Sequence, residues 1–139
     1  MIEWLINLFK KKPEKKVGEL LYNAIRTPDG TILISRNVHD YKTYVDSISG
    51  EEYMVDGGKS YLRRNINKVM YEELSVYTTT DHKEVRETVE WGTYGPDGDE
   101  PLMYVKIKDL DDNHIGLILK YPLSTNFKNI LLKEQEYRS

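Results

Sequence analysis

The sequence predicts an α+β fold, in which two or three helices pack on one face or end of a mostly antiparallel β-sheet. Three observations lead to this class. The 139 residues are enough for one core, short β-prone stretches between tight turns fill positions 19–79, and the helical signals come later. Consecutive short strands joined by tight turns indicate hairpins or a meander, not alternating βαβ units. We therefore expect residues 17–139 to form a single α+β domain.

Residues 1–16 have a different character. Met1 to Phe9 carries apolar residues close to helical spacing, and lysines on both sides of Pro13 follow. This pattern predicts a short amphipathic helix and then a lysine-rich linker. Apolar residues flanked by lysines also suit a membrane surface, but so short a helix favours packing against the domain or an oligomer partner.

The first hairpin has the clearest local signal. Leu20–Thr27 and Thr31–Arg36 have strand character and flank the turn Thr27-Pro28-Asp29-Gly30. Proline presets the backbone angle of the first turn position, and glycine accepts the left-handed conformation that follows. This combination predicts a β-hairpin.

Further strands are expected along the first half of the chain. Two of them should pair around Ser49-Gly50, and the sharp turn Asp56-Gly57-Gly58 should lead into the others. The expected strands are His39–Ser47, Glu51–Val55, Tyr61–Asn67 and Leu74–Thr79.

The next segment should begin with a helix. Asp81 with Glu84 forms a capping-box pattern, and we expect that helix to end at Trp91-Gly92. After a turn-rich loop over 95–98, Leu102–Lys108 alternates like a strand.

Two helices are expected at the end of the sequence. The first is capped by Asp109 or Asp111 and stops before Pro122. The second is capped by Ser124 or Thr125. Their apolar stripes are formed by Ile115, Ile118 and Leu119 and by Phe127, Ile130 and Leu131.

Composition excludes several classes of protein. A net charge of −3 argues against binding to duplex nucleic acid, which needs a basic face. The absence of cysteine excludes a disulfide scaffold and a thiolate metal site. The apolar stretches are too short to span a membrane, and the N-terminal lysines follow the apolar residues, the reverse of a signal peptide. We expect a cytoplasmic protein.

No catalytic signature is present, so we expect a protein that is not an enzyme. The sequence lacks a phosphate-binding P-loop, a nucleophile elbow and a His-Glu-x-x-His zinc motif. A pair among His39, His82 and His114 would be needed for acid–base work, which leaves a His-dependent phosphodiesterase as an alternative. A metal site would need His39, Asp40 and Asp56 to converge, and we predict neither metal nor cofactor.

The residues best suited to bind a ligand surround the double glycine. Two glycines after Asp56 allow backbone N–H groups to turn outward towards a ligand, and arginine side chains suit phosphate. Aspartates can accept from ribose hydroxyls, and aromatic rings can stack on a purine. The candidate ligand-binding residues are Arg26, Arg36, His39, Asp40, Tyr41, Asp56, Gly57, Gly58, Tyr61, Arg63, Arg64 and Trp91. The alternative is a plain hairpin turn, with Asp40 paired to Arg63 and His39 an ordinary sheet residue.

Several of these segments resemble a family of small bacteriophage proteins over residues 20–120. The similarity lies in Ile25 to Leu33, in His39-Asp40-Tyr41, in Tyr53 to Gly58, in Tyr61-Leu62-Arg63-Arg64-Asn65 and in Trp91-Gly92. The family is identified with the first-described phage Thoeris anti-defence proteins. These proteins act as sponges that hold a cyclic nucleotide messenger of the bacterial immune system.

The resemblance implies a non-enzymatic protein of the host cytoplasm that forms a homo-oligomer, a dimer or higher. Its ligand would be a cyclic ADP-ribose isomer or a cyclic di- or trinucleotide, sequestered without cleavage. Arginines would grip the phosphates, Trp91 or a tyrosine would stack on adenine, and Asp40 or Asp56 would hold ribose hydroxyls. The alternative outside this family is a phage-encoded interaction module that acts on a host protein.

Overall fold

The computed structural model describes residues 18–66 and 69–139. The helix and linker predicted for residues 1–16 lie outside the described residues. The chain divides into two compact units, Met1–Thr79 and Thr80–Ser139. The single domain expected over 17–139 stays a prediction.

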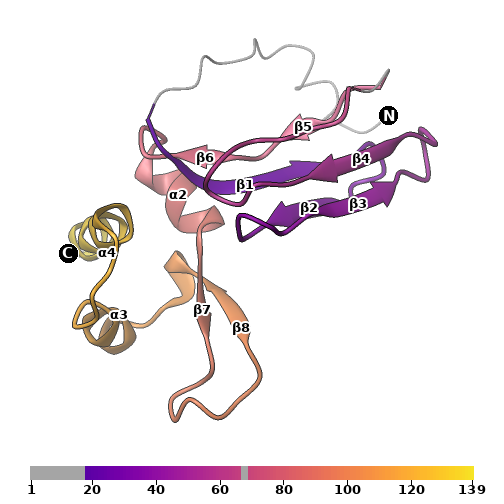
Figure 1. Cartoon of the computed structure of the whole chain (residues 1–139). Coiled ribbons are helices and arrows are strands. Elements are labelled where there is room, and N and C mark those ends of the chain that lie inside the picture. The colour runs from indigo at the N-terminus through magenta and orange to yellow at the C-terminus, as the bar shows by residue number, and fades with distance from the viewer. Residues whose placement is uncertain (1–17, 67–68) are drawn as a thin grey trace. The chain divides into compact units, whose positions relative to one another are not determined.

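The first unit is built from short antiparallel strands (Figure 1). Strand β1 pairs with β2 on one edge and with β5 and β6 on the other, while β3 and β4 form a separate hairpin. The β1–β2 and β3–β4 hairpins confirm the predicted pairings around Pro28-Asp29 and Ser49-Gly50. The strands are β1 Leu20–Arg26, β2 Ile32–Ser35, β3 Lys42–Val45, β4 Glu52–Val55, β5 Glu72–Glu73 and β6 Val76–Tyr77.

The core of this unit joins the sheet to the second hairpin. Ile25 and Leu33 of the β1–β2 pair pack with Tyr53 and Val55 of β4. The hydroxyl of Tyr53 donates to the carbonyl of Val69 over 2.7 Å, so this buried ring has a polar partner. Inward-facing side chains of both hairpins therefore bury one shared apolar layer.

The turns of the two hairpins are also tied together. One carboxylate oxygen of Asp29 accepts from Thr31, and the other accepts from Tyr44 and Ser47. The hydrogen bonds from Thr31, Tyr44 and Ser47 lower the pKa of Asp29 strongly. In return, the backbone N–H of Asp29 donates to buried Asp46 over 2.8 Å.

Three expectations for the first unit differ from the structure. Instead of a strand over Tyr61–Asn67, the described residues 61–66 make one isolated bridge, between Arg63 and Asp56, and Asn67 lies outside the described residues. The strand predicted over Leu74–Thr79 is shortened to β6, and β5 lies just before the predicted range. Between the two strands the Ser75 hydroxyl accepts from the N–H of Ala24, where a paired strand would supply a backbone carbonyl. Strand β3 starts only at Lys42, after a loop that the Asp40 carboxylate closes on the N–H of Arg36.

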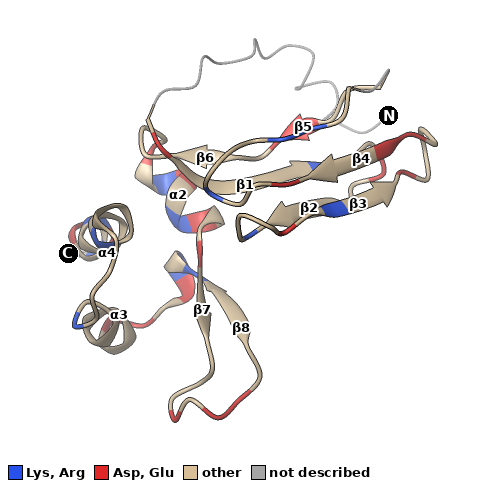
Figure 2. Cartoon of the chain, in the orientation of Figure 1, with Lys and Arg blue, Asp and Glu red and all other residues tan. Residues whose placement is uncertain are grey.

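The second unit contains the helices. Strands β7 and β8 form an antiparallel hairpin, with Trp91 opposite Val105. In Figure 2 the loop that joins them carries acidic residues and no basic one. The elements are α2 His82–Thr88, β7 Glu90–Thr93, β8 Met103–Lys106, the 3₁₀ turn η1 Ile107–Asp109, α3 Asp112–Ile118 and α4 Thr125–Arg138.

The predicted caps and ends of these helices are confirmed in part. Asp111 caps α3 by accepting from the N–H of His114, and Ser124 caps α4 by accepting from Phe127. Asp81 stands at the start of α2 but makes no side-chain cap bond. The expected end of this helix at Trp91-Gly92 is wrong, because both residues lie in β7 and pair with β8.

A buried carboxylate holds the second unit together. Glu134 of α4 is 0% exposed and accepts from Arg86 and His82 of α2 and from Arg138 of its own helix. Burial alone would raise the pKa of Glu134, but hydrogen bonds from Arg86, Arg138 and His82 outweigh it and lower the pKa to about 2. Arg138 also donates to the carbonyl of Ile107, so η1 joins the same cluster.

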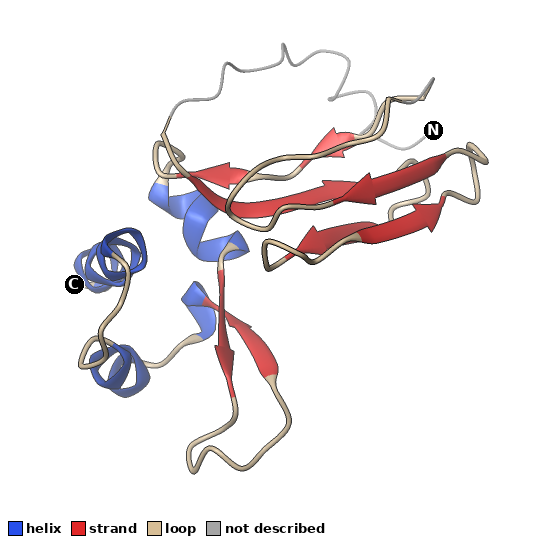
Figure 3. Cartoon of the chain, viewed as in Figure 1, coloured by secondary structure: helices blue, strands red, loops and turns tan. Residues whose placement is uncertain are grey.

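The α+β class is confirmed. The described residues form eight strands in antiparallel sheets and three α-helices (Figure 3).

The Glu134 cluster predicts acid-sensitive stability. Because the folded pKa lies below the ordinary 4.5, the stabilisation is present above the unfolded pKa and is lost as the pH falls from about 4.5 to about 2. For one such group, the free energy of unfolding changes by up to ~1.4 kcal/mol per pH unit. The free energy of unfolding, measured with urea at several pH values in this range, should depend less steeply on pH in Glu134→Gln than in the natural protein. The exposed Glu136→Gln on the same helix serves as the control, and equal slopes for all three proteins would contradict the assignment.

Candidate ligand-binding site

The structure brings together the two loops that the sequence singled out. The hydroxyl of Ser35, at the end of β2, donates to the carbonyl of Asp40 over 2.7 Å and accepts from the N–H of Gly58 over 2.9 Å. This serine thereby joins the His39-Asp40-Tyr41 loop to the double-glycine turn. The two segments are separated in the sequence, so a ligand-binding site shared between them requires this contact.

The double glycine is required by close packing. Gly57 and Gly58 have φ values of +99° and +53°, which disfavour other residues. A Cβ atom on Gly57 would lie 2.2 Å from the carbonyl oxygen of Tyr61, and one on Gly58 would lie 2.4 Å from the carbonyl carbon of Asn37. Both glycines are buried, so the turn is a packed part of the unit.

The N–H groups of this turn do not point towards a ligand, which corrects the expectation from the sequence. The N–H of Gly57 donates to the Asp56 carboxylate over 2.9 Å, and that of Gly58 donates to Ser35. Both donors are satisfied inside the protein, because a buried N–H without a partner is costly. An anion-binding nest of backbone amides is therefore absent from this turn.

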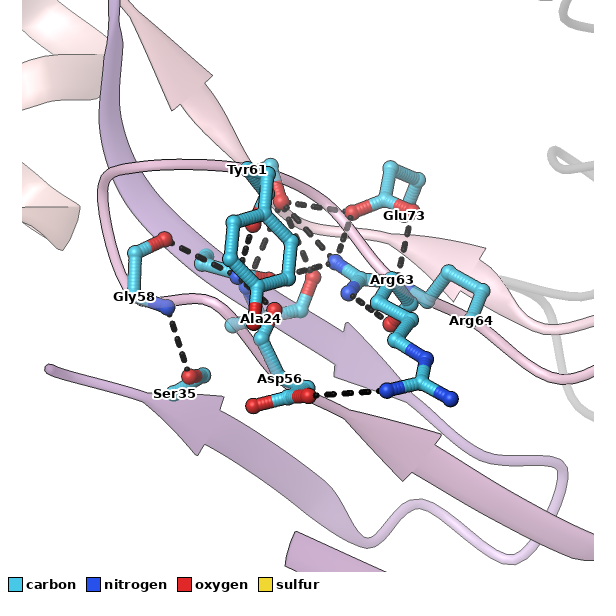
Figure 4. A network of polar contacts seen from close by, with 10 residues as sticks. Ala24, Ser35, Asp56, Gly58, Tyr61, Arg63, Arg64 and Glu73 are labelled. Carbon is cyan, nitrogen blue, oxygen red and sulfur yellow. Dashed lines mark hydrogen bonds and ion pairs between the residues drawn. The ribbon is translucent and has the colours of Figure 1, made fainter. Parts of the chain in front are cut away.

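A buried asparagine holds the turn on the sheet. The side-chain amide of Asn23, in β1, donates to the carbonyls of Asp56 and Gly58 over 2.9 Å and of Tyr61 over 3.2 Å. Its oxygen accepts from Arg64 over 2.7 Å, and because a guanidinium only donates, this contact fixes the orientation of the amide. Figure 4 shows the resulting network around the turn. Sequence reasoning missed Asn23, for which a polar residue inside an apolar strand was the only signal.

Two of the four candidate arginines are held in ion pairs along the sheet. The side chain of Arg64 is 11% exposed and donates to both carboxylate oxygens of Glu73 over 2.8 and 3.2 Å. Arg26 pairs with Glu72 over 2.9 Å. Glu72 and Glu73 form β5, so these pairs fasten that short strand to β1 and to the turn. Both guanidinium groups are therefore bound to carboxylates of the protein, whereas the sequence led us to expect them to bind a phosphate.

Arg63 differs from these two. Its side chain is 65% exposed, and its guanidinium lies 3.5 Å from the Asp56 carboxylate, a long distance for an ion pair (Figure 4). The alternative pair of Arg63 with Asp40 does not form, since Asp40 instead accepts from the backbone of Arg36 and lies 3.5 Å from Lys42. Arg63 is the candidate arginine with the most accessible guanidinium.

Tyr61 adds an exposed aromatic ring to the same segment as Arg63. Ring carbons of Tyr61 would lie 2.6 and 2.7 Å from a Cβ atom on Gly57, so the ring rests against that glycine. The residue remains 45% exposed. Tyr61 and Arg63 are two positions apart in a segment whose exposure alternates, which places both side chains on its outer face.

The remaining candidates lie in different surroundings. His39 and Tyr41 are exposed on the loop that Asp40 closes, and Arg36 is half-buried at its start. Trp91 belongs to the second unit, where its ring packs against Phe127 at a centroid distance of 5.2 Å. Trp91 is half-buried there, and its indole rests against the buried ring of Phe127.

The part of the chain that the structure describes offers no metal site and no membrane span. Over 18–66 and 69–139, no three His, Asp or Glu side chains are grouped to hold an ion. In the same ranges, no helix is long and apolar enough to cross a bilayer. Comparison with known proteins gave no matching family model, no matching curated protein and no matching solved structure.

Replacing Asn23 by alanine should destabilise the first unit by about 2–4 kcal/mol, because it leaves buried carbonyls and the Arg64 guanidinium without their partner. Urea unfolding measures this change. The matched control is Asn37→Ala, at an exposed asparagine in a neighbouring loop, which should shift stability by no more than about 0.5 kcal/mol. A similar cost for both variants would contradict the role assigned to Asn23.

The close packing of Gly57 can be separated from its backbone angle. Gly30 has a similar φ of +92° but has nothing within 4 Å of its Cβ position. Gly30→Ala should therefore cost only the left-handed strain, about 1–2 kcal/mol. Gly57→Ala should cost about 1–3 kcal/mol more, because the Tyr61 backbone must move. Equal losses of melting temperature in the two variants would show that the packing is not restrictive.

Proposed function

We propose that the first unit binds a small phosphorylated ligand of the cyclic nucleotide class and holds it without cleaving it. In this proposal the Tyr61 ring stacks on a base and Arg63 binds a phosphate. The observation that carries it is the pairing of an exposed, weakly held guanidinium with an exposed ring beside a rigid turn. These are the two functions that such a ligand requires of a protein surface.

We expect Arg63 to exchange its ion pair with Asp56 for hydrogen bonds to a ligand phosphate, because the ion pair is the weaker interaction. The ion pair joins a mostly exposed arginine to an Asp56 side chain that is 10% exposed, and at 3.5 Å with a solvated arginine it contributes no more than about 1 kcal/mol. Charge-assisted hydrogen bonds from a guanidinium to phosphate contribute about 1.5–3 kcal/mol. Asp56 also accepts from Gly57, so it keeps a partner when Arg63 turns to the ligand.

The scaffold supports tight binding without rearrangement. Asn23, Ser35 and Arg64 fix the backbone on either side of Tyr61, so little conformational entropy is lost when a ligand arrives. The resemblance to phage anti-defence sponges agrees with this site, because a sponge needs affinity and no catalytic group. We propose the same role here, namely sequestration of an immune messenger in the host cytoplasm by a homo-oligomer.

Thermal-shift measurements with cyclic dinucleotides, cyclic trinucleotides and cyclic ADP-ribose isomers test the proposal. A tight ligand should raise the melting temperature by mass action. Arg63→Ala should weaken binding by about tenfold or more, as the loss of charge-assisted bonds implies, and should lower the melting temperature of the free protein only slightly, by the loss of the long ion pair to Asp56. Arg63→Lys should recover only part of the affinity, because lysine lacks the planar fork.

The matched control is Lys133→Ala, which removes one exposed positive charge from α4. This variant should bind as the natural protein does. Ligand released by heating should be intact, whereas recovered linear product would favour a phosphodiesterase. Failure of every nucleotide to shift the melting temperature, or unchanged binding in Arg63→Ala, would contradict the proposed site.

A further inference from the structure

The β7–β8 hairpin of the second unit has two unlike faces. On one face Trp91 packs against Phe127 of α4. On the other face Leu102 and Tyr104 both lie over Gly92, each 3.3 Å from the position of a Cβ atom there. Tyr94 follows Gly92 by two positions, so it extends the same face. Leu102, Tyr104 and Tyr94 are exposed large apolar side chains on this face.

The loop at the end of the hairpin is acidic. Asp97, Asp99 and Glu100 are exposed, and no ion pair to a described residue holds any of them. The loop between β7 and β8 has acidic segments and no basic one along it (Figure 2). Unpaired carboxylates thus border an aromatic and aliphatic surface.

We propose that this hairpin face is a docking surface for a basic, partly apolar segment of a partner protein. Apolar side chains of the segment would cover Leu102 and Tyr104, and its lysines or arginines would face Asp97 and Asp99. An exposed apolar patch with a charged rim is typical of a protein interaction site. This surface belongs to the second unit, whereas the proposed ligand site belongs to the first.

The negative charge of the loop favours a basic segment over three other possible partners of this surface. Nucleic acid and an anionic membrane surface would be repelled by the acidic loop. A second copy of the hairpin would cover the apolar side chains but would offer the acidic loop no basic partner. A basic segment alone gains from both the apolar and the acidic part of the surface.

A synthetic peptide in which leucine and lysine alternate is the probe for this surface, with binding to the full chain followed by fluorescence anisotropy. A leucine–glutamate peptide and a serine–lysine peptide are the probe controls. The leucine–lysine peptide should bind, the leucine–glutamate peptide should not, and the serine–lysine peptide should bind more weakly. Equal binding of the leucine–lysine and leucine–glutamate peptides would overturn the proposal.

Variants of the chain locate the binding. Asp97→Lys with Asp99→Lys should weaken binding by about tenfold, because attraction becomes repulsion. Glu87→Lys with Glu136→Lys makes the same change of charge at exposed positions outside the hairpin and should have little effect. If both double variants lose the same amount of peptide affinity, binding depends only on the overall charge of the protein, and the proposed site is wrong. Leu102→Ser with Tyr104→Ser should also weaken binding, whereas Arg63→Ala should leave it unchanged.

Discussion

The first unit depends on one buried side-chain amide. Asn23 lies in the central strand, and its NH₂ group donates to the carbonyls of a loop whose described residues make one isolated bridge, between Asp56 and Arg63. Without these bonds, the carbonyls of Asp56, Gly58 and Tyr61 would be desolvated without a partner, which is the most expensive way to bury a polar group. The double glycine, the position of Tyr61 and the burial of Arg64 all follow from this arrangement.

This constraint also sorts the arginines by role. Arg64 completes the Asn23 network and pairs with Glu73, and Arg26 pairs with Glu72, so both act in folding. Arg63 is on the opposite side of the same segment and remains mostly exposed. An alternating segment thus gives two adjacent arginines different environments, one inside the fold and one at its surface. The proposed ligand site depends on that difference.

The sequence predicted what local chemistry determines. Pro28 and Gly30 marked the first hairpin, and Asp111 and Ser124 marked the starts of two helices, because turns and caps need particular residues nearby. The contacts of Asn23, Arg64 and Glu134 were not predictable in this way, since their partners are distant in sequence and any of several carboxylates would have served. The helix expected to end at Trp91-Gly92 was wrong for the same reason: pairing with β8, a long-range contact, overrode a local stop signal.

Hydrogen exchange of the unmodified protein, followed by NMR, tests the role of Asn23 most directly. The network predicts slow exchange for the backbone amides of Gly57 and Gly58 and for the side-chain amide of Asn23, despite their location in or against a loop. The amide of exposed Asp99 in the β7–β8 loop provides a reference for rapid exchange. Exchange of Gly58 and the Asn23 side chain as fast as that reference would show that the turn is not held on the sheet.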